Sequence, residues 1–316
     1  MSTRDALEAA RALVATVPGW AGREPTLRPG VAPVASPMNQ GVDATSLRAR
    51  DAATGESLWV KIADPDAALF ADPASVVAAA RQAGTLGVGP EVVAADPLTG
   101  DLVMRDLSGS HRTATLNRLA EPAIRDAVLA AMRAFQAGPP LPRTMGVFDH
   151  IESLLRRAGA AGVALPADHA WLLDNIRTAA QAIRAAGIDT VPAHGDGNAS
   201  NVMIDEAGGV LLVDFDLAAN RDPFEDLGSF LVEANTFDPA AWESFEAFHG
   251  RFDERLFNRA RLYGVADDLR WGLIGAILAR TSARSDLEFL KYAEWRFLRC
   301  RMAMRDQRFE ERVRRV

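Results

Sequence analysis

The sequence has 316 residues, of which 35 are basic and 42 acidic, so its net charge is −7, and 48% of its residues are hydrophobic. This is ordinary globular composition with enough length for two lobes around one cleft, which excludes disordered and fibrous proteins. Binding to a phosphate backbone requires a basic surface, so we expect no nucleic-acid partner.

The location of the protein is constrained by its single cysteine and its apolar segments. Cys300 alone allows neither an intramolecular disulfide framework nor a site with several thiolates, which favours a reducing, cytoplasmic compartment. The first residues contain no apolar region of the signal-peptide type. The longest apolar stretches, such as residues 273–279, are far shorter than the about 18 residues that cross a bilayer. We therefore expect no signal peptide and no insertion into a membrane.

The first third of the chain is predicted to be mainly β structure. Residues 1–17 have the pattern of a short amphipathic helix, and the stretch 18–37 is rich in proline and glycine. The sequence leaves open whether this N-terminal part covers the small lobe or pairs two chains. Alternating residues at 45–50 and an apolar run at 57–62 flank a turn-like segment and predict a hairpin.

A helix and two further strands complete this part of the chain. Asp72 followed by proline is typical of a helix N-cap, and Gly87 is typical of a helix end, so a helix is predicted over 73–86. Strands are predicted at 91–95 and 101–104, on either side of a turn.

After Gly109 the pattern becomes helical, with one β-hairpin made of 202–204 and 210–213. The predicted helices are 120–137, 149–159, 166–187, 223–235, 240–262, 266–281 and 286–310. We therefore expect an α+β fold with two lobes and a site between them. The predicted lobes are a small β-rich N-terminal lobe, 1–109, with 1–30 as a helical or irregular extension, and a larger helical C-terminal lobe, 110–316.

The most informative motif is a His-Gly-Asp sequence that is followed after four residues by Asn and, beyond the hairpin, by Asp-Phe-Asp. Its polar side chains are His194, Asp196, Asn201, Asp214 and Asp216. Phosphoryl transfer needs a carboxylate near the attacking hydroxyl and oxygen ligands for Mg²⁺, because positioning and electrostatics supply most of its catalysis. The kinase catalytic loop provides these groups as His-x-Asp-x-x-x-x-Asn and Asp-Phe-Gly. The spacing here is that of a kinase, with Asp216 in place of the glycine.

This pattern assigns a role to each side chain. Asp196 is expected to accept or orient the proton of an acceptor hydroxyl, and His194 to brace the loop. Asn201 and Asp214 are the expected ligands of Mg²⁺, and Asp216 is expected to contact a second metal ion or its water. The alternative, a polar loop of ordinary turn residues, is disfavoured by the order of these residues around the predicted hairpin.

Lys61 lies late on the predicted strand 57–62, at the position where kinases place their phosphate-binding lysine. A lysine on a strand is usually a solvated edge residue, but the downstream motif favours a nucleotide ligand. Gly41 is the only glycine in the expected nucleotide-covering segment, 37–45, that could give phosphates a close approach. Met104 and Asp106, at the end of the last predicted strand, are assigned to the same nucleotide site.

A partner for this lysine is not evident from the sequence. Kinases pair it with a glutamate on the following helix, but the helix predicted at 73–86 contains no acidic residue. Asp64, Asp66 and Asp72 are the alternatives that the sequence offers, and it does not choose among them.

The motif, the segment 220–228 and the order of elements resemble the aminoglycoside phosphotransferase and choline/ethanolamine kinase-like superfamily over about residues 30–300. The resemblance implies a protein-kinase-like fold, Mg²⁺ with ATP or, second, GTP, and a small hydroxylated acceptor. The late segments 271–273 and 290–297 resemble the helices that close the acceptor pocket in the choline/ethanolamine branch. Choline or a related amino alcohol is therefore the first expectation, and a monomer or homodimer is expected.

The resemblance also implies an acceptor pocket. Aromatic faces and a carboxylate hold a quaternary ammonium, so Trp271 is the expected wall and Glu233 the expected counter-charge, with Phe237 and Trp295 adding to the cage. Each aromatic residue could instead be ordinary core. Ile274 stands where that branch tends to have a second aromatic residue, so an aminoglycoside, thiamine or sugar acceptor stays open. A nucleotide-binding pseudokinase is the alternative from another functional class.

Overall fold

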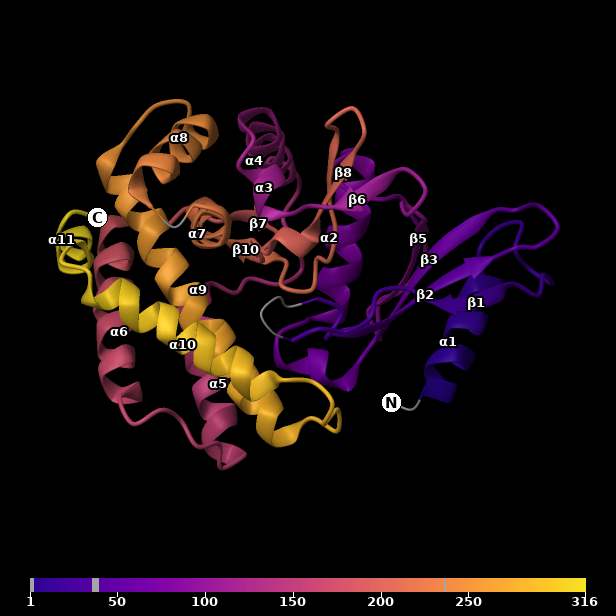
Figure 1. Cartoon of the computed structure of the whole chain (residues 1–316), viewed down its shortest axis with the longest axis horizontal. Helices are drawn as coiled ribbons and strands as arrows, with labels where there is room; N and C mark the ends of the chain where they lie inside the picture. Colours follow the sequence, from indigo (N-terminus) through magenta and orange to yellow (C-terminus); the bar gives the residue numbers. More distant parts are fainter. Residues whose placement is uncertain (1–2, 36–39, 236) are drawn as a thin grey trace.

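The computed structural model describes residues 3–35, 40–235 and 237–316, and it combines an N-terminal antiparallel sheet with a helical C-terminal region (Figure 1). The sheet has the spatial order β1-β2-β3-β5-β4. Its strands are β1 (Thr26–Pro29), β2 (Ala44–Arg50), β3 (Ser57–Ala63), β4 (Val92–Asp96) and β5 (Asp101–Arg105). The expected α+β arrangement is confirmed, whereas β1, in the proline- and glycine-rich stretch, was not predicted.

The central strand β3 separates two faces of this sheet. Successive side chains on a strand point to opposite faces, and Trp59 and Lys61 line a cavity while Val60 is fully buried on the other side. There it packs with Ala10 and Val14 of helix α1 (Thr3–Ala15), which belong to the same apolar cluster. The apolar stripe of α1 therefore covers the outer face of the sheet.

Helix α2 (Pro73–Thr85) packs against the other side of the sheet and begins as its sequence predicts. The Asp72 carboxylate accepts the backbone N–H of Ser75 at 2.9 Å, and proline occupies the first turn. Gly87 follows the helix with φ +70°, a left-handed conformation that glycine adopts without strain. A 3-10 turn, η1 (Pro65–Leu69), connects β3 to this helix.

Helices form most of the C-terminal region. They are α3 (Leu116–Leu119), α4 (Pro122–Gln136), α5 (Val147–Ala160), α6 (His169–Ala186), α7 (Pro223–Ala234), α8 (Asp238–His249), α9 (Glu254–Thr281), α10 (Phe289–Arg305) and α11 (Arg308–Arg314). The predicted boundary between α8 and α9 was wrong. The chain breaks at Gly250, which has φ +89°, and Asp253 caps α9 by accepting the N–H of Leu256 at 3.1 Å.

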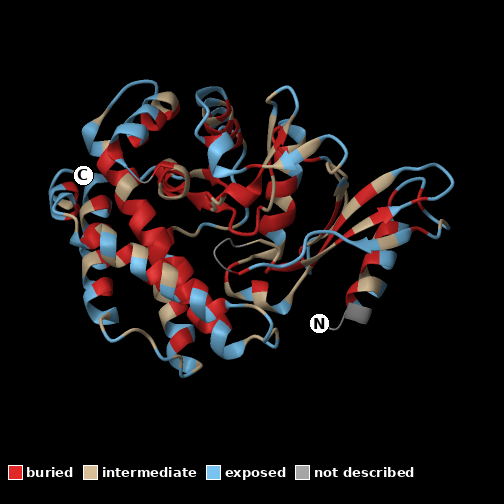
Figure 2. Cartoon of the chain, viewed as in Figure 1, coloured by how far each residue is buried: buried red, intermediate tan, exposed pale blue. Residues whose placement is uncertain are grey.

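Helix α9 continues through the predicted break because its glycine serves packing. A Cβ on Gly264 would lie 2.7 Å from the carbonyl oxygen of Gly228 in α7, so the two helices cross at backbone contact. Figure 2 shows α9 buried along most of its length. The prediction of a single helix over 286–310 was also wrong, since α10 ends at Arg305 and α11 begins at Arg308.

Short strands place the motif residues. The predicted hairpin is confirmed as β8 (Val202–Asp205) and β9 (Val210–Leu212), and β6 (His111–Thr113) joins it as a third strand. A second pair, β7 (Val191–Ala193) and β10 (Ala219–Arg221), is antiparallel. Residues 194–201, including the 3-10 turn η2 (Ala199–Asn201), therefore lie between β7 and β8, and residues 213–218 lie between β9 and β10.

In the part of the chain that the structure describes, no helix is long and apolar enough to cross a membrane. The division of the chain between residues 109 and 110 stays a prediction.

Candidate active site

His194 joins the two halves of the motif. Its Nδ1 accepts the backbone N–H of Asp196 at 3.3 Å, so the ring proton lies on Nε2, which donates to the carbonyl oxygen of Val213 at 2.9 Å. The ring also packs against Phe215, with 4.6 Å between centroids. This one side chain therefore ties the loop that contains Asp196 to the segment that contains Asp214.

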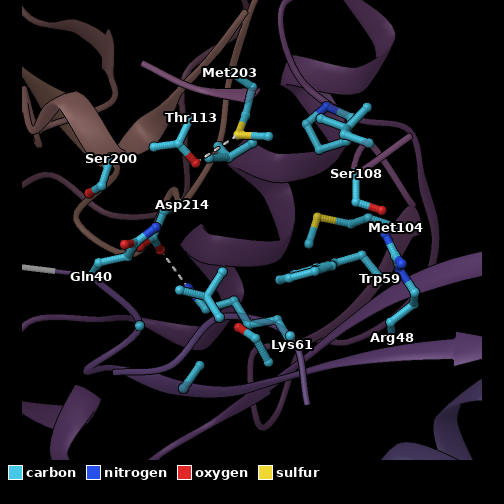
Figure 3. A pocket seen from close by; sticks show the side chains of 18 of the residues that line it. Gln40, Arg48, Trp59, Lys61, Met104, Ser108, Thr113, Ser200, Met203 and Asp214 are labelled. Carbon is cyan, nitrogen blue, oxygen red and sulfur yellow. Dashed lines mark hydrogen bonds and ion pairs between the residues drawn. The ribbon is translucent and has the colours of Figure 1, made fainter. Parts of the chain in front are cut away.

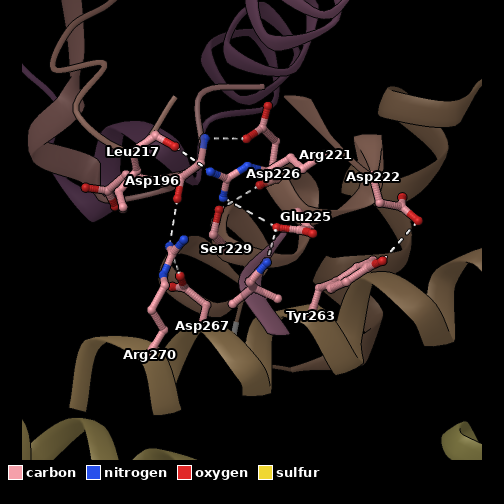
Figure 4. A network of polar contacts seen from close by, with 12 residues as sticks. Asp196, Leu217, Arg221, Asp222, Glu225, Asp226, Ser229, Tyr263, Asp267 and Arg270 are labelled. Atoms are coloured by element: carbon pink, nitrogen blue, oxygen red, sulfur yellow. Dashed lines mark hydrogen bonds and ion pairs between the residues drawn. The ribbon is translucent and has the colours of Figure 1, made fainter. Parts of the chain in front are cut away.

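Two buried charged residues, Asp226 and Arg270, bind the backbone of this loop (Figure 4). The Asp226 carboxylate accepts the backbone N–H groups of His194 at 3.1 Å and Gly195 at 2.7 Å. Arg270 donates to the carbonyl oxygen of Gly195 at 2.7 Å and pairs with Asp267. Because these partners come from α7 and α9, the loop is fixed by the core of the C-terminal region. Asp226 and Asp267 were not predicted as site residues.

The loop also lies against backbone. Gly195 has φ +82°, and a Cβ there would meet the carbonyl oxygen of Leu217 at 2.7 Å. A Cβ on Gly197 would lie 2.3 Å from the backbone nitrogen of Phe230 in α7. Glycine allows the loop to approach the segment between β9 and β10 at Gly195 and helix α7 at Gly197 more closely than any side chain would permit.

Asp196 carries the carboxylate expected to receive a proton. It accepts the N–H of Asn198 at 3.1 Å and the Nδ2 amide of Asn201 at 2.9 Å. Burial, followed by the negative charge of Asp267, raises the pKa of Asp196 to about 6. An ionised carboxylate with a pKa close to neutral suits general-base chemistry.

Lys61 lies at the centre of a cluster of carboxylates. Its ammonium group is 2.5 Å from Asp214, 2.6 Å from Asp216 and 2.7 Å from Asp43 (Figure 3 shows the contact with Asp214). Burial disfavours the charge of Lys61, but the three carboxylates outweigh it and raise the pKa of the lysine well above its ordinary value. The motif residues and the strand lysine therefore meet at one point.

These residues fit a divalent cation. Oxygen atoms of Asp43, Asp214 and Asp216 lie within 4.8 Å of one another. Asn201 directs its Nδ2 group toward Asp196, and its Oδ1 atom, which accepts the Ser200 hydroxyl at 3.4 Å, keeps a second lone pair for a metal ion. Carboxylate and amide oxygens are the ligands that Mg²⁺ prefers. Asp214 also has φ +67°, the only positive φ outside glycine among the described residues, and such strain is common at functional sites.

None of the three aspartates considered as partners of Lys61 contacts it. Asp72 caps α2, Asp64 caps η1, and Asp66 pairs with Arg284 at 2.8 Å. Asp43 takes this place instead. It lies in the segment expected to cover the nucleotide, where the sequence drew attention only to glycine. Residues 37–39 of that segment lie outside the described residues.

A cavity of about 560 Å³ opens above the lysine (Figure 3). The residues that line it include Gly41, Lys61, Met104, Asn201 and Asp214. Its apolar wall is formed by Trp59, Met104 and Met203.

Asp106, assigned to the nucleotide site from the sequence, does not line this cavity. Its carboxylate accepts the hydroxyls of Ser57 at 2.7 Å and Ser108 at 2.6 Å and pairs with Arg48 at 2.7 Å. These contacts fix the segment after β5.

Aromatic residues of α9 and α10 form a row close enough to Asp196 for its charge to act on Tyr292. Trp271 is 4% exposed and packs on Tyr292, with 6.2 Å between ring centroids, and Tyr292 packs on Trp295 at 6.0 Å. Burial raises the pKa of Tyr292, and the negative charges of Asp196, Asp267 and Glu233 add to the increase, which places the Glu233 carboxylate near the row. Phe237 is 77% exposed and has no ring contact among the described residues. Tyr292 was not predicted as a site residue.

Comparison with known families decides how these features are classified. Residues 34–265 match the phosphotransferase enzyme family, and they contain both halves of the motif and Lys61. The chain belongs to this family. No curated protein matches the sequence.

Solved structures of this phosphotransferase superfamily share the fold along almost the whole chain. A choline/ethanolamine kinase family protein from Mesorhizobium loti is 25% identical, with a TM-score of 0.77 and 98% of both chains covered. The choline kinase LicA from Streptococcus pneumoniae is 13% identical, with a TM-score of 0.75 and coverage of 94% of this chain and 98% of that one. A spectinomycin phosphotransferase, solved with ADP and spectinomycin, is 12% identical, with a TM-score of 0.60 and coverage of 95% and 97%. The expected superfamily and protein-kinase-like fold are confirmed.

Proposed function

We propose that this phosphotransferase moves the γ-phosphate of ATP, with Mg²⁺, onto a hydroxyl of a small acceptor, and that the acceptor is choline or a related amino alcohol. One observation carries the proposal. Lys61 and Asp214 are in direct contact and line the same cavity as Asn201, whose Nδ2 group donates to the carboxylate of Asp196. Related structures hold AMP or ADP, which supports a nucleotide as the phosphate donor.

The lysine end of the site binds the phosphates. Asp214, Asp216 and Asn201 would hold Mg²⁺, which when bound neutralises charge on the phosphate oxygens. One lysine faces three aspartates, so the cluster carries excess negative charge whenever they are ionised. We therefore expect ATP to bind weakly without the metal ion, and Lys61 to exchange a carboxylate for a phosphate oxygen when MgATP enters.

Asp196 acts at the other end. Its hydrogen bonds from Asn198 and Asn201 fix the carboxylate, and the loop beneath it is held by Asp226 and Arg270. The free lone pairs of Asp196 orient the acceptor hydroxyl and receive its proton as the oxygen attacks the γ-phosphate. Fixing both reactants in this way supplies the positioning on which the reaction depends.

The acceptor side suits a cation. The rings of Trp271, Tyr292 and Trp295 already hold cations, because guanidinium groups of Arg270, Arg296 and Arg299 lie over them at 4.8–5.9 Å from the ring centroids. Glu233 and Asp267 add negative charge near Asp196. Phe237 is left out of the proposed pocket because it is exposed. This combination supports an amino alcohol first, with aminoglycosides, thiamine and sugars as the alternatives within the superfamily. A cytoplasmic enzyme that acts as a monomer or homodimer remains part of the proposal.

The acceptor is tested with a panel. Purified protein is incubated with Mg²⁺ and γ-labelled ATP, or GTP in parallel, together with choline, ethanolamine, thiamine, sugars or aminoglycosides. We expect labelled phosphocholine or another phosphorylated amino alcohol. A different product keeps the phosphotransfer site and overturns the assignment of the acceptor pocket. Nucleotide binding without any product would favour the pseudokinase interpretation.

A further inference from the structure

Lys61 needs a partner that remains with it during the reaction. In the proposed function Asp214 and Asp216 turn to the metal ion, so their contacts with the lysine cannot hold it in place throughout. Protein kinases solve this with a glutamate on the helix after the lysine strand. Here helix α2 contains no acidic residue, and Ala80 is its residue beside Lys61, where both line a cavity of about 20 Å³.

Asp43 has the contacts that such a partner requires. Its carboxylate is 2.7 Å from the ammonium group of Lys61, and the residue is 6% exposed. Lys61 is 7% exposed, so both partners of this ion pair are shielded from water.

The backbone at Asp43 is fixed from two directions. The carbonyl oxygen of Asp43 accepts the N–H of Asp64 at 2.8 Å, just beyond the paired strands β2 and β3. The carbonyl oxygen of Val42 accepts a hydrogen bond from Arg284, which also pairs with Asp66 at 2.8 Å. Because Arg284 lies in the segment between α9 and α10, the C-terminal region contributes directly to the position of Asp43.

We propose that Asp43 is the positioning residue for Lys61 and takes the place of the helix glutamate of protein kinases. The inference rests on the proposed function, since it concerns the same phosphate-binding lysine. Asp43 lies two residues from Gly41, and both line the nucleotide cavity. The partner of the lysine therefore comes from the segment that covers the nucleotide, and α2 does not supply it.

A double-mutant cycle tests whether Asp43 acts through Lys61. The rate of MgATP turnover is compared for wild type, Asp43→Asn, Lys61→Met and the double variant. Misplacement of a phosphate ligand by about 1 Å can cost about 100-fold, so we expect Asp43→Asn to lower kcat by about 10- to 100-fold. In the Lys61→Met background the same change should have an effect of less than about twofold. Asp51→Asn serves as the matched control, because Asp51 is also a buried aspartate of the N-terminal region but pairs with Arg23 outside the cavity.

Two results overturn the proposal. Equal losses from Asp43→Asn in both backgrounds would show that Asp43 acts independently of the lysine. Asp43→Asn could instead raise the Mg²⁺ concentration needed for half-maximal activity. If the double variant with Lys61→Met showed the same increase, Asp43 would be a metal ligand. Binding of Mg·ADP, measured by calorimetry on the same four proteins, reports coupling between Asp43 and Lys61 without any acceptor. Coupling in this binding assay supports the role of Asp43 even if no acceptor is phosphorylated. The absence of a phosphorylated product would then count only against the proposed function.

Discussion

At the scale of single residues, the site concentrates features that cost stability. Asp214 has a left-handed backbone, a conformation that costs a residue other than glycine on the order of 1–3 kcal/mol. Burial and the nearby charge of Asp43 raise the pKa of Asp214, against the opposing effect of Lys61. A carboxyl group whose pKa is raised by folding costs stability when it ionises, so at neutral pH the charge of Asp214 destabilises the fold.

This sign leads to a prediction for Asp214→Asn. Asparagine tolerates the left-handed conformation and removes the charge, so the melting temperature should stay the same or rise while phosphate transfer is lost. Asp51→Asn is the comparison. The fold lowers the pKa of Asp51, whose carboxylate accepts the backbone N–H of Ala53 and pairs with Arg23. The Asp51→Asn variant should therefore melt at a lower temperature than wild type. Thermal unfolding of both variants checks the prediction, and a larger loss in Asp214→Asn would contradict it.

At the scale of elements, most of the helices, and most strands of the N-terminal sheet, could be predicted from the sequence because their patterns are local. Asp72 and Gly87 indicated the two ends of α2, and the alternating residues of β2 with the apolar run of β3 indicated the hairpin. The break predicted between residues 262 and 266 is absent, and this interval contains Gly264. A glycine inside a helical pattern has two possible roles. It can end a helix, or it can allow a crossing like that between Gly264 and Gly228, which only the tertiary structure reveals.

A pair of glycine substitutions tests the packing of the loop on α7. In Gly197→Ala the new Cβ would lie 2.3 Å from the backbone of Phe230, so the loop must move away from the helix. We expect a loss of activity and of about 1–3 kcal/mol in the free energy of unfolding. Gly159→Ala, in α5 and with no atom near the added Cβ, should be neutral or stabilise by about 0.5–1 kcal/mol. Similar unfolding curves for the two variants would show that the loop does not rest on α7.

Helix α5 carries a titratable group that couples its packing to pH. The buried His150 ring lies 3.1 Å from the carbonyl oxygen of Leu69 in η1, and burial followed by the charge of Arg270 lowers its pKa to about 3. The unfolded chain therefore binds a proton between about pH 6.5 and pH 3 that the folded chain does not, and each pH unit in this range costs about 1.4 kcal/mol of stability.

The comparison of wild type with His150→Gln isolates this effect. Glutamine keeps a donor for the carbonyl group but does not titrate. Urea unfolding at pH 7 and pH 5 should show a smaller loss of stability for the variant than for wild type. Equal losses would mean that His150 is charged in the fold or is solvated there.

At the scale of the whole molecule, η1 connects the two regions. Carbonyl oxygens of Ala68 and Phe70 accept hydrogen bonds from Arg157 at 2.8 Å and Arg143 at 2.6 Å, and Asp66 pairs with Arg284. These partners are separated by many residues in sequence, and no local pattern indicates them. The same reason explains why Asp43 was missed: the motif predicted the groups that a kinase needs, but the partner of Lys61 depends on which segment the fold brings beside it.

The central claim is that Asp196 receives the proton of an acceptor while Lys61, Asp214 and Asn201 hold the phosphates and their metal ion. Its most direct test is the rate of phosphate transfer from MgATP by wild type, Asp196→Asn and the control Glu206→Gln, an exposed residue of the hairpin turn. The account predicts a loss of about 10²- to 10⁴-fold in kcat for Asp196→Asn, unchanged binding of MgATP, and normal activity in the control. Retention of wild-type kcat by Asp196→Asn would contradict it.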